Sequence, residues 1–276
     1  MSGEQRTTSE FFRGVEQREI PIRQWRGYSP LFYYDASMTA VVFTADAAAV
    51  QALMPTPRHR PLRPLPGTAL VAIHCFQYRA SQLGAYCEVS LSAGISYTRD
   101  AWAHGALHLV RSVLSERYEA YVFQLPVDSE VAMAGGIDYL NVPKYMARMA
   151  FQERGGQLIV TVYGDERGGP ELFTLAVPSL PARAHHSARA RDVAPLRVME
   201  LASYPVKGGR TLRAELKVNL IDSATSWLPR GVALRLGEHG KARQLRALRL
   251  GHAVELIYAP RCEMILSMSE ADGPPR

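Results

Sequence analysis

The chain has few cysteines and no long apolar run, and these absences exclude several classes of protein. Its 276 residues include three cysteines, an odd and sparse set with no metal-ligand spacing. We therefore expect Cys75, Cys87 and Cys262 to be reduced thiols of a cytoplasmic protein. No apolar run is long enough to span a bilayer, and residues 1–6 lack the apolar core of a signal peptide, so no membrane association is expected.

The sequence also lacks the motifs of several catalytic classes. It contains no glycine-rich phosphate loop, no Gly-x-Ser-x-Gly nucleophile elbow and no internal repeat. Carboxylate and histidine side chains are not clustered at metal-binding spacing, so we predict no metal and no other cofactor. His74 lies in an apolar run, residues 71–76, where a histidine buried in the core is the expectation.

The positive charge does not follow the pattern of a nucleic-acid-binding protein. The net charge is +6, and the arginines are densest in residues 58–63, 183–197 and 243–249. No such stretch is interleaved with aromatic residues in an RNA- or DNA-binding motif. We therefore expect a solvated arginine-rich surface, which also suits an anionic small substrate, and no nucleic-acid partner. An RNA-associated protein, the remaining alternative, would show steeply salt-dependent binding to polyanions.

Lysine is the scarcest basic residue, and one lysine stands in an unusual place. Of 32 basic residues only four are lysines, and Lys144 directly follows a proline among apolar neighbours. A desolvated lysine loses its proton and attacks a carbonyl to form a Schiff base, whereas arginine stays charged. The residue types alone also allow a second interpretation, in which Lys144 is an ordinary lysine in an accidental setting.

The dominant periodicity is that of β-strands. Residues 1–28 are polar and aperiodic and are predicted to form an arm that packs on the body or on a neighbouring subunit; residues 269–276 are predicted to be a disordered tail. Between them, residues 29–268 are predicted to form a single domain. Strands are expected at residues 86–97, 118–124, 158–163, 172–177, 212–221, 232–236 and 253–258, with residues 164–170 joining a hairpin.

Helices are few in the predicted structure. Residues 46–54 form a short helix that Pro55 ends, and residues 129–139 form another with Ser129 as its N-cap. Many strands with two or three short helices indicate a mainly β fold with a closed antiparallel sheet.

Several segments of the chain resemble the acetoacetate decarboxylase family. In residues 135–147 a glycine-rich turn leads to a Pro-Lys pair, and the family's Schiff-base lysine falls on Lys144. Residues 83–88 are similar to the family's Gly-x-Tyr-x-Glu segment, whose glutamate, here Glu88, belongs to the active site. Residues 40–55 and 235–258 resemble its first strand and helix and its closing strands. The resemblance implies a barrel-like β fold, a Schiff-base activity and a homo-oligomer.

The chain departs from the family pattern at three places. The decarboxylases have a second lysine directly after the first, where this chain has Tyr145. They carry an arginine ahead of the first strand, where this chain reads Asp35-Ala36-Ser37, and a second glutamate that would fall near Ile73 or His74. The resemblance therefore implies family membership more strongly than it implies decarboxylation of acetoacetate.

Strand geometry predicts which side chains accompany the lysine. Pro143 favours a strand that begins at Lys144, and Arg148 would lie on the same face about two pleats along, where it would hold a substrate carboxylate. In the alternative interpretation Arg148 reaches the barrel rim and pairs with a surface acid. Glu88 shares a face with Ser90 and Ser92 and is predicted to transfer protons or to orient water. Tyr86 and Ser90 are predicted substrate contacts, and Tyr145 is expected to pack.

These residues support two hypotheses of function. The first is a lysine Schiff-base lyase that acts on a small keto acid, by decarboxylation or by aldolase-dehydratase chemistry at carbon–carbon bonds, through an imine at Lys144. The second is a barrel that binds a small ligand without catalysis, in which Lys144 contributes only its charge. Trapping with borohydride separates them, because only an imine is reduced to a stable adduct.

Overall fold

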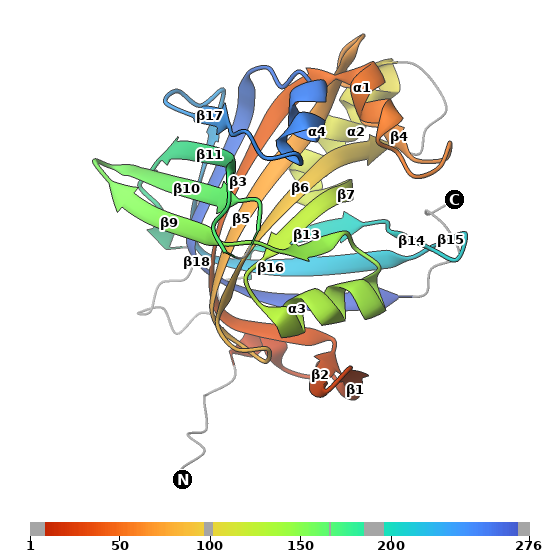
Figure 1. The fold of residues 1–276 in the computed structure, drawn as a ribbon, viewed down its shortest axis with the longest axis vertical. Helices are drawn as coiled ribbons and strands as arrows, with labels where there is room; N and C mark the ends of the chain where they lie inside the picture. The colour runs from red at the N-terminus through yellow and green to blue at the C-terminus, as the bar shows by residue number, and fades with distance from the viewer. Residues whose placement is uncertain (1–8, 97–101, 166, 185–195, 270–276) are drawn as a thin grey trace.

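The computed structural model describes residues 9–96, 102–165, 167–184 and 196–269 (Figure 1). Seven of its strands lie side by side in the order β6, β5, β3, β18, β16, β13, β7, and β7 also pairs with β6, which closes a barrel. The bounds of these strands are β3 (Leu31–Asp46), β5 (Thr68–Ser81), β6 (Tyr86–Ser96), β7 (Arg117–Val127), β13 (Val198–Ser203), β16 (Arg213–Trp227) and β18 (Ala253–Ser269). The predicted mainly β fold and closed barrel are confirmed.

The prediction of a purely antiparallel barrel is wrong, because the barrel contains parallel as well as antiparallel pairs of strands. Strand β7 pairs in parallel with β13 and with the short β8 (Lys144–Met146). Parallel neighbours need a crossover connection, because a tight hairpin joins only antiparallel strands. Helix α3 (Glu130–Gly135) lies in the crossover from β7 to β8. Three of the four strands of a second sheet lie in the crossover from β7 to β13.

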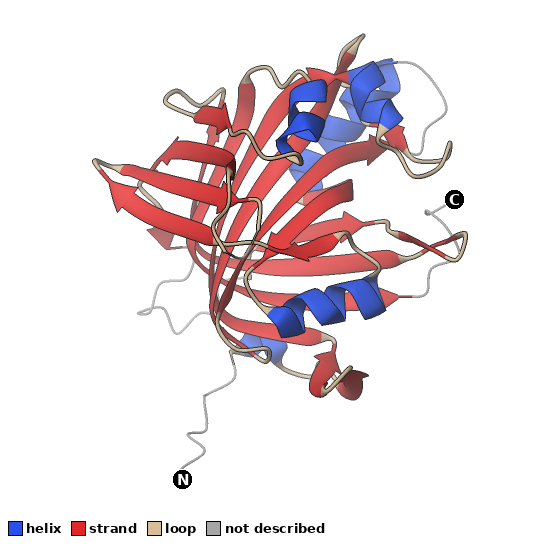
Figure 2. Ribbon diagram, viewed as in Figure 1, coloured by secondary structure: helices blue, strands red, loops and turns tan. Residues whose placement is uncertain are grey.

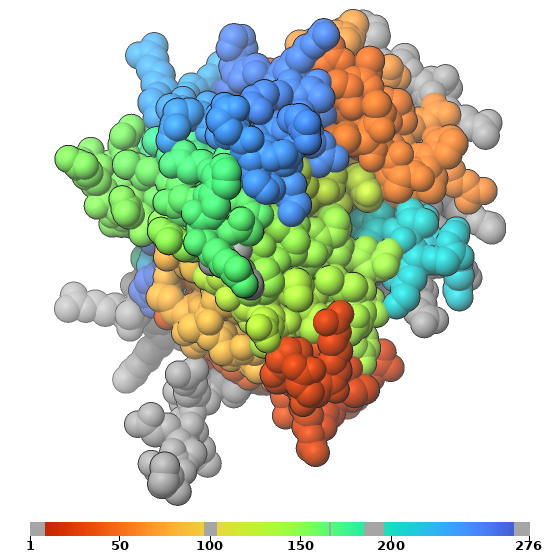
Figure 3. Space-filling model, in the orientation of Figure 1, coloured from red at the N-terminus to blue at the C-terminus, as the bar shows by residue number. Residues whose placement is uncertain are grey.

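The second sheet packs against the barrel through a shared core. It has the order β17, β11, β10, β9, with bounds β9 (Met149–Arg154), β10 (Gln157–Tyr163), β11 (Glu171–Pro178) and β17 (Ala233–Leu236). The predicted hairpin is confirmed as β10 and β11. Apolar side chains of this sheet, Val160 and Leu175 among them, join one buried cluster with Val89 and Leu91 of β6. Figure 3 shows the green residues of this sheet beside the blue residues of α4 on the same face of the molecule.

Alternation along β6 separates this core from the barrel interior. Val89, Leu91 and Ala93 are fully buried in the shared core. The intervening Glu88, Ser90, Ser92 and Gly94 line a cavity inside the barrel. The period of two read from the sequence therefore assigned both faces of this strand correctly.

Helices are few, as predicted, but two were not anticipated (Figure 2). The helices are α1 (Ala47–Ala52), α2 (Trp102–Ser115), α3 and α4 (Ala242–Ala247), together with a π-helical turn at Gly136–Leu140 and a 3₁₀ turn at Glu10–Phe12. Helices α2 and α4 were not predicted from the sequence. Along α2, Leu109 and Ser112 face the cavity while Leu107, Val110 and Leu114 are exposed, so apolar residues occur on both sides and obscure the amphipathic pattern. Among the described residues no helix is long and apolar enough to cross a membrane.

Short elements complete the chain. They are the hairpin β1 (Arg18–Ile22) and β2 (Trp25–Ser29), the pair β14 (Val206–Lys207) and β15 (Arg210–Thr211), and the two-residue strands β4 (Arg60–Pro61) and β12 (Arg183–Ala184). The segment predicted as an arm thus contains a hairpin, and Phe11 and Phe12 pack against Phe32 and Ile265 of the barrel. Of the predicted tail, Ser269 ends β18 and residues 270–276 lie outside the described residues.

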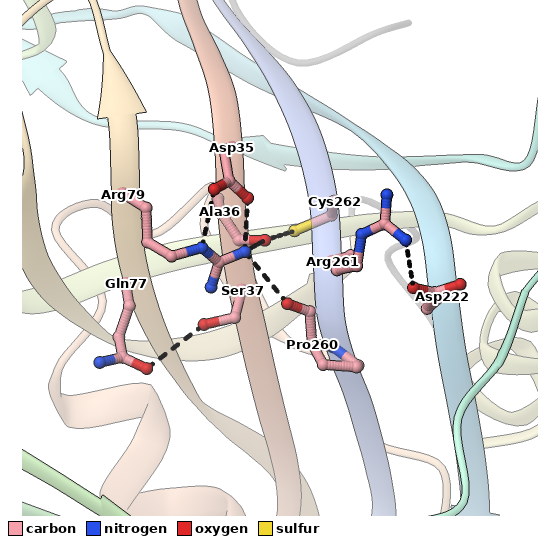
Figure 4. Close-up of polar contacts among 9 residues, drawn as sticks. All are labelled: Asp35, Ala36, Ser37, Gln77, Arg79, Asp222, Pro260, Arg261 and Cys262. Atoms are coloured by element: carbon pink, nitrogen blue, oxygen red, sulfur yellow. Dashed lines mark hydrogen bonds and ion pairs between the residues drawn. The ribbon is translucent and has the colours of Figure 1, made fainter.

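Hydrogen bonds of one arginine connect three barrel strands where the pairing of β3 is irregular. The Arg79 guanidinium bonds to both oxygens of Asp35, at 2.9 and 2.5 Å, and to the backbone carbonyls of Ala36 and Pro260, at 2.9 and 3.2 Å (Figure 4). The pairing of β3 with β5 shifts register on both sides of Asp35. One side chain therefore connects β5, β3 and β18 at a bulge.

Replacing Arg79 by alanine is expected to lower the free energy of unfolding by about 1–2 kcal/mol, because two carbonyls and a carboxylate lose a charged donor. The control is Arg261→Ala, which removes one surface ion pair with Asp222 at 3.2 Å and should cost roughly 0.5 kcal/mol or less. Urea unfolding of both variants measures the difference. Equal losses would mean that the bulge does not depend on Arg79.

Candidate functional site

Lys144 reaches the barrel interior because of the turn that precedes it. After α3 the chain continues through the π-helical turn, and Asn141 then takes a left-handed conformation with φ of 48°. Pro143 follows, and Lys144 begins a strand, β8, as the sequence predicted. In the structure Lys144 pairs with Leu125 of β7. The Lys144 side chain runs directly over Gly136, whose lack of a side chain leaves room for it.

The Lys144 amine lies against a carboxylate from a distant part of the chain. Its Nζ is 2.6 Å from Oε2 of Glu88, and the two side chains are only 4% and 10% exposed. Tyr78 donates a longer hydrogen bond of 3.4 Å to the other oxygen of Glu88. The structure thus brings together the two residues predicted to be catalytic, each from a different strand.

Three tyrosines surround this pair and remain protonated. Tyr33 and Tyr86 share a hydrogen bond of 3.0 Å, and the centre of the Tyr33 ring lies 4.2 Å from that of Tyr78. Burial raises the pKa of all three hydroxyls, and the negative charge of Glu88 raises it further. These groups therefore serve as neutral hydrogen-bonding groups around the ion pair.

The pair opens into a cavity of about 400 Å³ that is lined by the barrel strands and α2. Its walls are mostly apolar and carry polar groups at a few places, Ser90 and Ser92 among them. Among the described residues that line it, Lys144 is the only lysine or arginine, whereas three glutamates (Glu88, Glu119 and Glu255) contribute. Tyr86 lines a second, smaller pocket on the other side of Lys144. The predicted substrate contacts of Tyr86 and Ser90 stay predictions.

The prediction that Arg148 shares a strand face with Lys144 is wrong. Strand β8 ends at Met146, and a new strand begins at Met149 in the second sheet. Arg148 lies in the break between them, where its guanidinium sits 4.6 Å from the centre of the Tyr163 ring. It is not among the residues that line the cavity. The regular strand assumed from the sequence is interrupted because the chain leaves the barrel at this point.

Tyr145, which replaces the family's second lysine, points away from the amine. Its hydroxyl donates to Gln124 at 2.9 Å, and Nζ of Lys241 lies 3.6 Å from the centre of its ring. The residue packs at the edge of the shared core, as expected. In the described part of the chain no group of three or more histidine, cysteine or acidic side chains is arranged to hold a metal ion.

Two titratable residues line the cavity although the sequence did not place them there: His74 was expected in the core, and Glu255 only as part of a strand. His74 lines the cavity and stacks on Phe76, and burial lowers its pKa to about 4. Glu255 of β18 is 6% exposed and also lines the cavity, and burial raises its pKa to about 7. The signal for Glu255 was a lone acidic residue within the apolar strand predicted at residues 253–258.

The raised pKa of Glu255 predicts a pH-dependent effect on stability. An unfolded chain releases this proton near pH 4.5, whereas the folded protein holds it until about pH 7, so this group lowers stability as the pH rises between those values. Glu255→Gln removes the effect, because the amide does not ionise. The difference in free energy of unfolding between Glu255→Gln and the wild type should therefore increase in favour of the variant above pH 4.5. At pH 8 this difference should be about 1–3 kcal/mol larger than at pH 4.5. Urea unfolding at pH 5 and pH 8 measures it, and a pH-independent difference would contradict it.

Comparison with known proteins agrees with this fold. The family model of acetoacetate decarboxylase (ADC) matches residues 19–269. We found no match among curated proteins. The acetoacetate decarboxylase of Legionella pneumophila superposes with a TM-score of 0.58 at 14% identity, over 87% of this chain and 86% of that one.

Two further solved structures share the fold. The enduracididine biosynthesis enzyme MppR, solved in complex with pyruvate, has a TM-score of 0.56 at 14% identity, over 88% of this chain and 91% of its own. An acetoacetate decarboxylase-like enzyme from Sphingomonas wittichii has a TM-score of 0.51 at 17% identity, over 89% and 94%. At these identities the structural likeness establishes the fold alone.

Proposed function

Because the chain belongs to the acetoacetate decarboxylase family, by a match that covers residues 19–269, we propose that it is a lysine Schiff-base lyase. Its substrate is a keto acid, and its reaction is decarboxylation or aldolase-dehydratase chemistry through an imine at Lys144. The observation that carries the proposal is the buried contact of 2.6 Å between the Lys144 amine and Glu88. Schiff-base chemistry requires an amine nucleophile that a substrate can reach and a group that transfers protons, and the cavity wall has both in Lys144 and Glu88.

Glu88 supports the first step. Only a neutral amine attacks a carbonyl, so the ammonium must give up a proton when the substrate arrives. The nearest acceptor is Oε2 of Glu88 at 2.6 Å. The amine nitrogen then bonds to the carbonyl carbon, and the resulting carbinolamine loses water to give a protonated imine. Glu88 is placed to return its proton to the departing hydroxyl.

The imine then accepts electrons from the substrate. In a β-keto acid the bond to the carboxylate breaks, its electron pair moves into the imine, and CO₂ leaves. The enamine that remains takes a proton on carbon. In the aldolase-dehydratase alternative no CO₂ leaves: the imine loses a proton from the neighbouring carbon to the Glu88 carboxylate, the resulting enamine attacks an aldehyde to form a new carbon–carbon bond, and the aldehyde oxygen takes up that proton. Water finally adds to the imine carbon and releases the ketone, which restores the Lys144 amine.

The cavity wall favours loss of a carboxylate over its retention. Among the described lining residues no arginine is present, and the glutamates outnumber the single lysine. A carboxylate placed there meets apolar and negative surroundings that disfavour its charge. Departure of CO₂ removes that charge from the substrate.

Reduction with borohydride tests the proposal directly. The intact mass of the protein is measured after incubation with pyruvate or acetoacetate and borohydride, for the wild type and Lys144→Ala. A mass gain in the wild type that is lost in the variant supports an imine at Lys144. No gain with these or with any other keto acid would contradict the proposed lyase.

A non-catalytic binding barrel is the second candidate, and one observation favours it. The Lys144 amine is engaged in an ion pair, and neither the following residue nor the described cavity wall supplies a second cation. Such a binder would retain keto acids in equilibrium dialysis but would show no adduct after borohydride treatment. Self-association, expected from the family, stays a prediction that sedimentation velocity would measure.

A further inference from the structure

The cavity is larger than a small keto acid requires. Its volume of about 400 Å³ lies within the range of sites that hold drug-sized ligands. Lys144 and Glu88 occupy one part of it, and residues from β5, β7, β16, β18 and α2 line the remainder. Most of the space therefore lies away from the reactive amine.

Strand register gives the extent of this space along the strand direction. The row of paired residues that starts at Glu88 passes through Phe76 and Met38 to Ala259 of β18. Glu255 precedes Ala259 by four residues, which places it roughly 13 Å further along the strand direction. Between the level of Glu88 and the level of Glu255 along the strands, the residues that line the cavity include Ala40, His74 and Ile257.

Two buried polar side chains, Ser92 and Glu255, line the cavity at the level furthest from Glu88. The row that contains Ser92 passes through Ala72 and Val42 to Glu255, so Ser92 and Glu255 lie at one height on different walls. The hydroxyl oxygen of Ser92 is buried and has no hydrogen-bond partner in the described structure. Glu255 is 6% exposed; Trp227 pairs with it on the neighbouring β16, and its charge helps to raise the pKa of Tyr118 on β7. Buried polar groups normally have a partner, so the unpaired Ser92 hydroxyl leaves a hydrogen bond for water or a ligand in the cavity.

The far end of the cavity also adjoins the surface. Trp227 pairs with Glu255 across β16 and β18 and is 55% exposed, and the neighbouring Leu228 is 73% exposed. Both line the cavity, together with His108 and Leu109 of α2. An apolar compound thus has a route to the interior past these side chains.

We propose that the cavity takes an elongated carbonyl compound, whose carbonyl reacts at Lys144, whose apolar chain follows the barrel wall, and whose terminal hydroxyl bonds to Glu255. The carbonyl end rests on the proposed function. An extended chain of about ten carbons covers roughly 13 Å. A hydroxyl suits Glu255 better than an ammonium group does, since the cavity wall there is apolar and disfavours charge.

A series of unbranched 2-ketones from four to fourteen carbons, with and without a terminal hydroxyl, tests the proposal. The measurement is the concentration that gives half-maximal borohydride adduct on the wild-type protein. Each added methylene should lower that concentration by about fourfold until the chain fills the cavity. Near ten carbons the terminal hydroxyl should lower it by a further tenfold or so.

Variants of the cavity wall test the terminal hydroxyl and the apolar chain of the ligand separately. Glu255→Leu should remove the preference for the hydroxyl, and Glu255→Gln, which keeps an acceptor oxygen, should retain part of it. Ala40 lies between the levels of Glu88 and Glu255, so the larger side chain of Ala40→Leu should shorten the chain length that binds best. Thermal unfolding checks that this variant remains folded.

The outcomes distinguish this proposal from the proposed lyase. Adducts that form with short ketones but do not strengthen with chain length would overturn the elongated ligand and leave the lyase in place. Adducts that strengthen with length but ignore the hydroxyl, or prefer a terminal amine, would overturn the role of Glu255. No adduct at any length would overturn the proposed lyase and the carbonyl end of this ligand together.

Discussion

Lys144→Arg is expected to lower turnover of the reacting keto acid by roughly 10⁴-fold or more, because a guanidinium stays protonated and forms no imine. The positive charge beside Glu88 is kept, so the buried carboxylate retains a partner. The free energy of unfolding should therefore change by about 1 kcal/mol or less. Loss of activity with the fold retained would locate the defect in the chemistry.

A second substitution at the same position separates charge from chemistry. Lys144→Met has a similar shape but leaves Glu88, 10% exposed, without its cation, which is expected to cost about 2–4 kcal/mol of stability. Both variants should fail to form a borohydride adduct. Turnover by Lys144→Arg within tenfold of the wild type would contradict the Schiff-base mechanism, whatever the stability of the two proteins.

Features that depend on local sequence pattern were predicted well. The alternation through Glu88, Ser90 and Ser92 correctly placed these residues on the inner face of β6, because a strand has a fixed period of two. The proline before Lys144 correctly marked the start of a strand. What the sequence did not contain was the contact between these two strands, which forms only when β6, β7 and β8 assemble side by side.

Features that depend on closure of the barrel were missed or wrong. Arg148 was placed beside Lys144 on the assumption of one regular strand, but the chain leaves the barrel after Met146. Glu255 was predicted only as part of a strand, since its height relative to Ser92 follows from three successive pairings. No periodicity within one segment carries that information.

Gly136 is a further feature that the sequence alone did not reveal, and it gives the second prediction of large effect. Its backbone is helical, with φ of −65° and ψ of −40°, so alanine fits the backbone there. A Cβ at this position would nevertheless stand 2.5 Å from Cε and 3.0 Å from Cγ of Lys144. The lysine side chain must therefore move, which carries its amine away from Glu88.

Gly136→Ala is accordingly expected to lower kcat by about 10²-fold, since a displacement near 1 Å in a reacting group has an effect of that size. The matched control is Gly135→Ala, where a Cβ would meet only the flexible tip of Ile22 at 3.2 Å. Both positions are helical, so both variants should gain a similar amount of helix propensity, about 1 kcal/mol. A merely structural role for Gly136 would lower stability and leave the rate of imine formation unchanged. A positioning role lowers that rate, measured by single-turnover borohydride trapping, in Gly136→Ala alone, and equal rates in the two variants would rule it out.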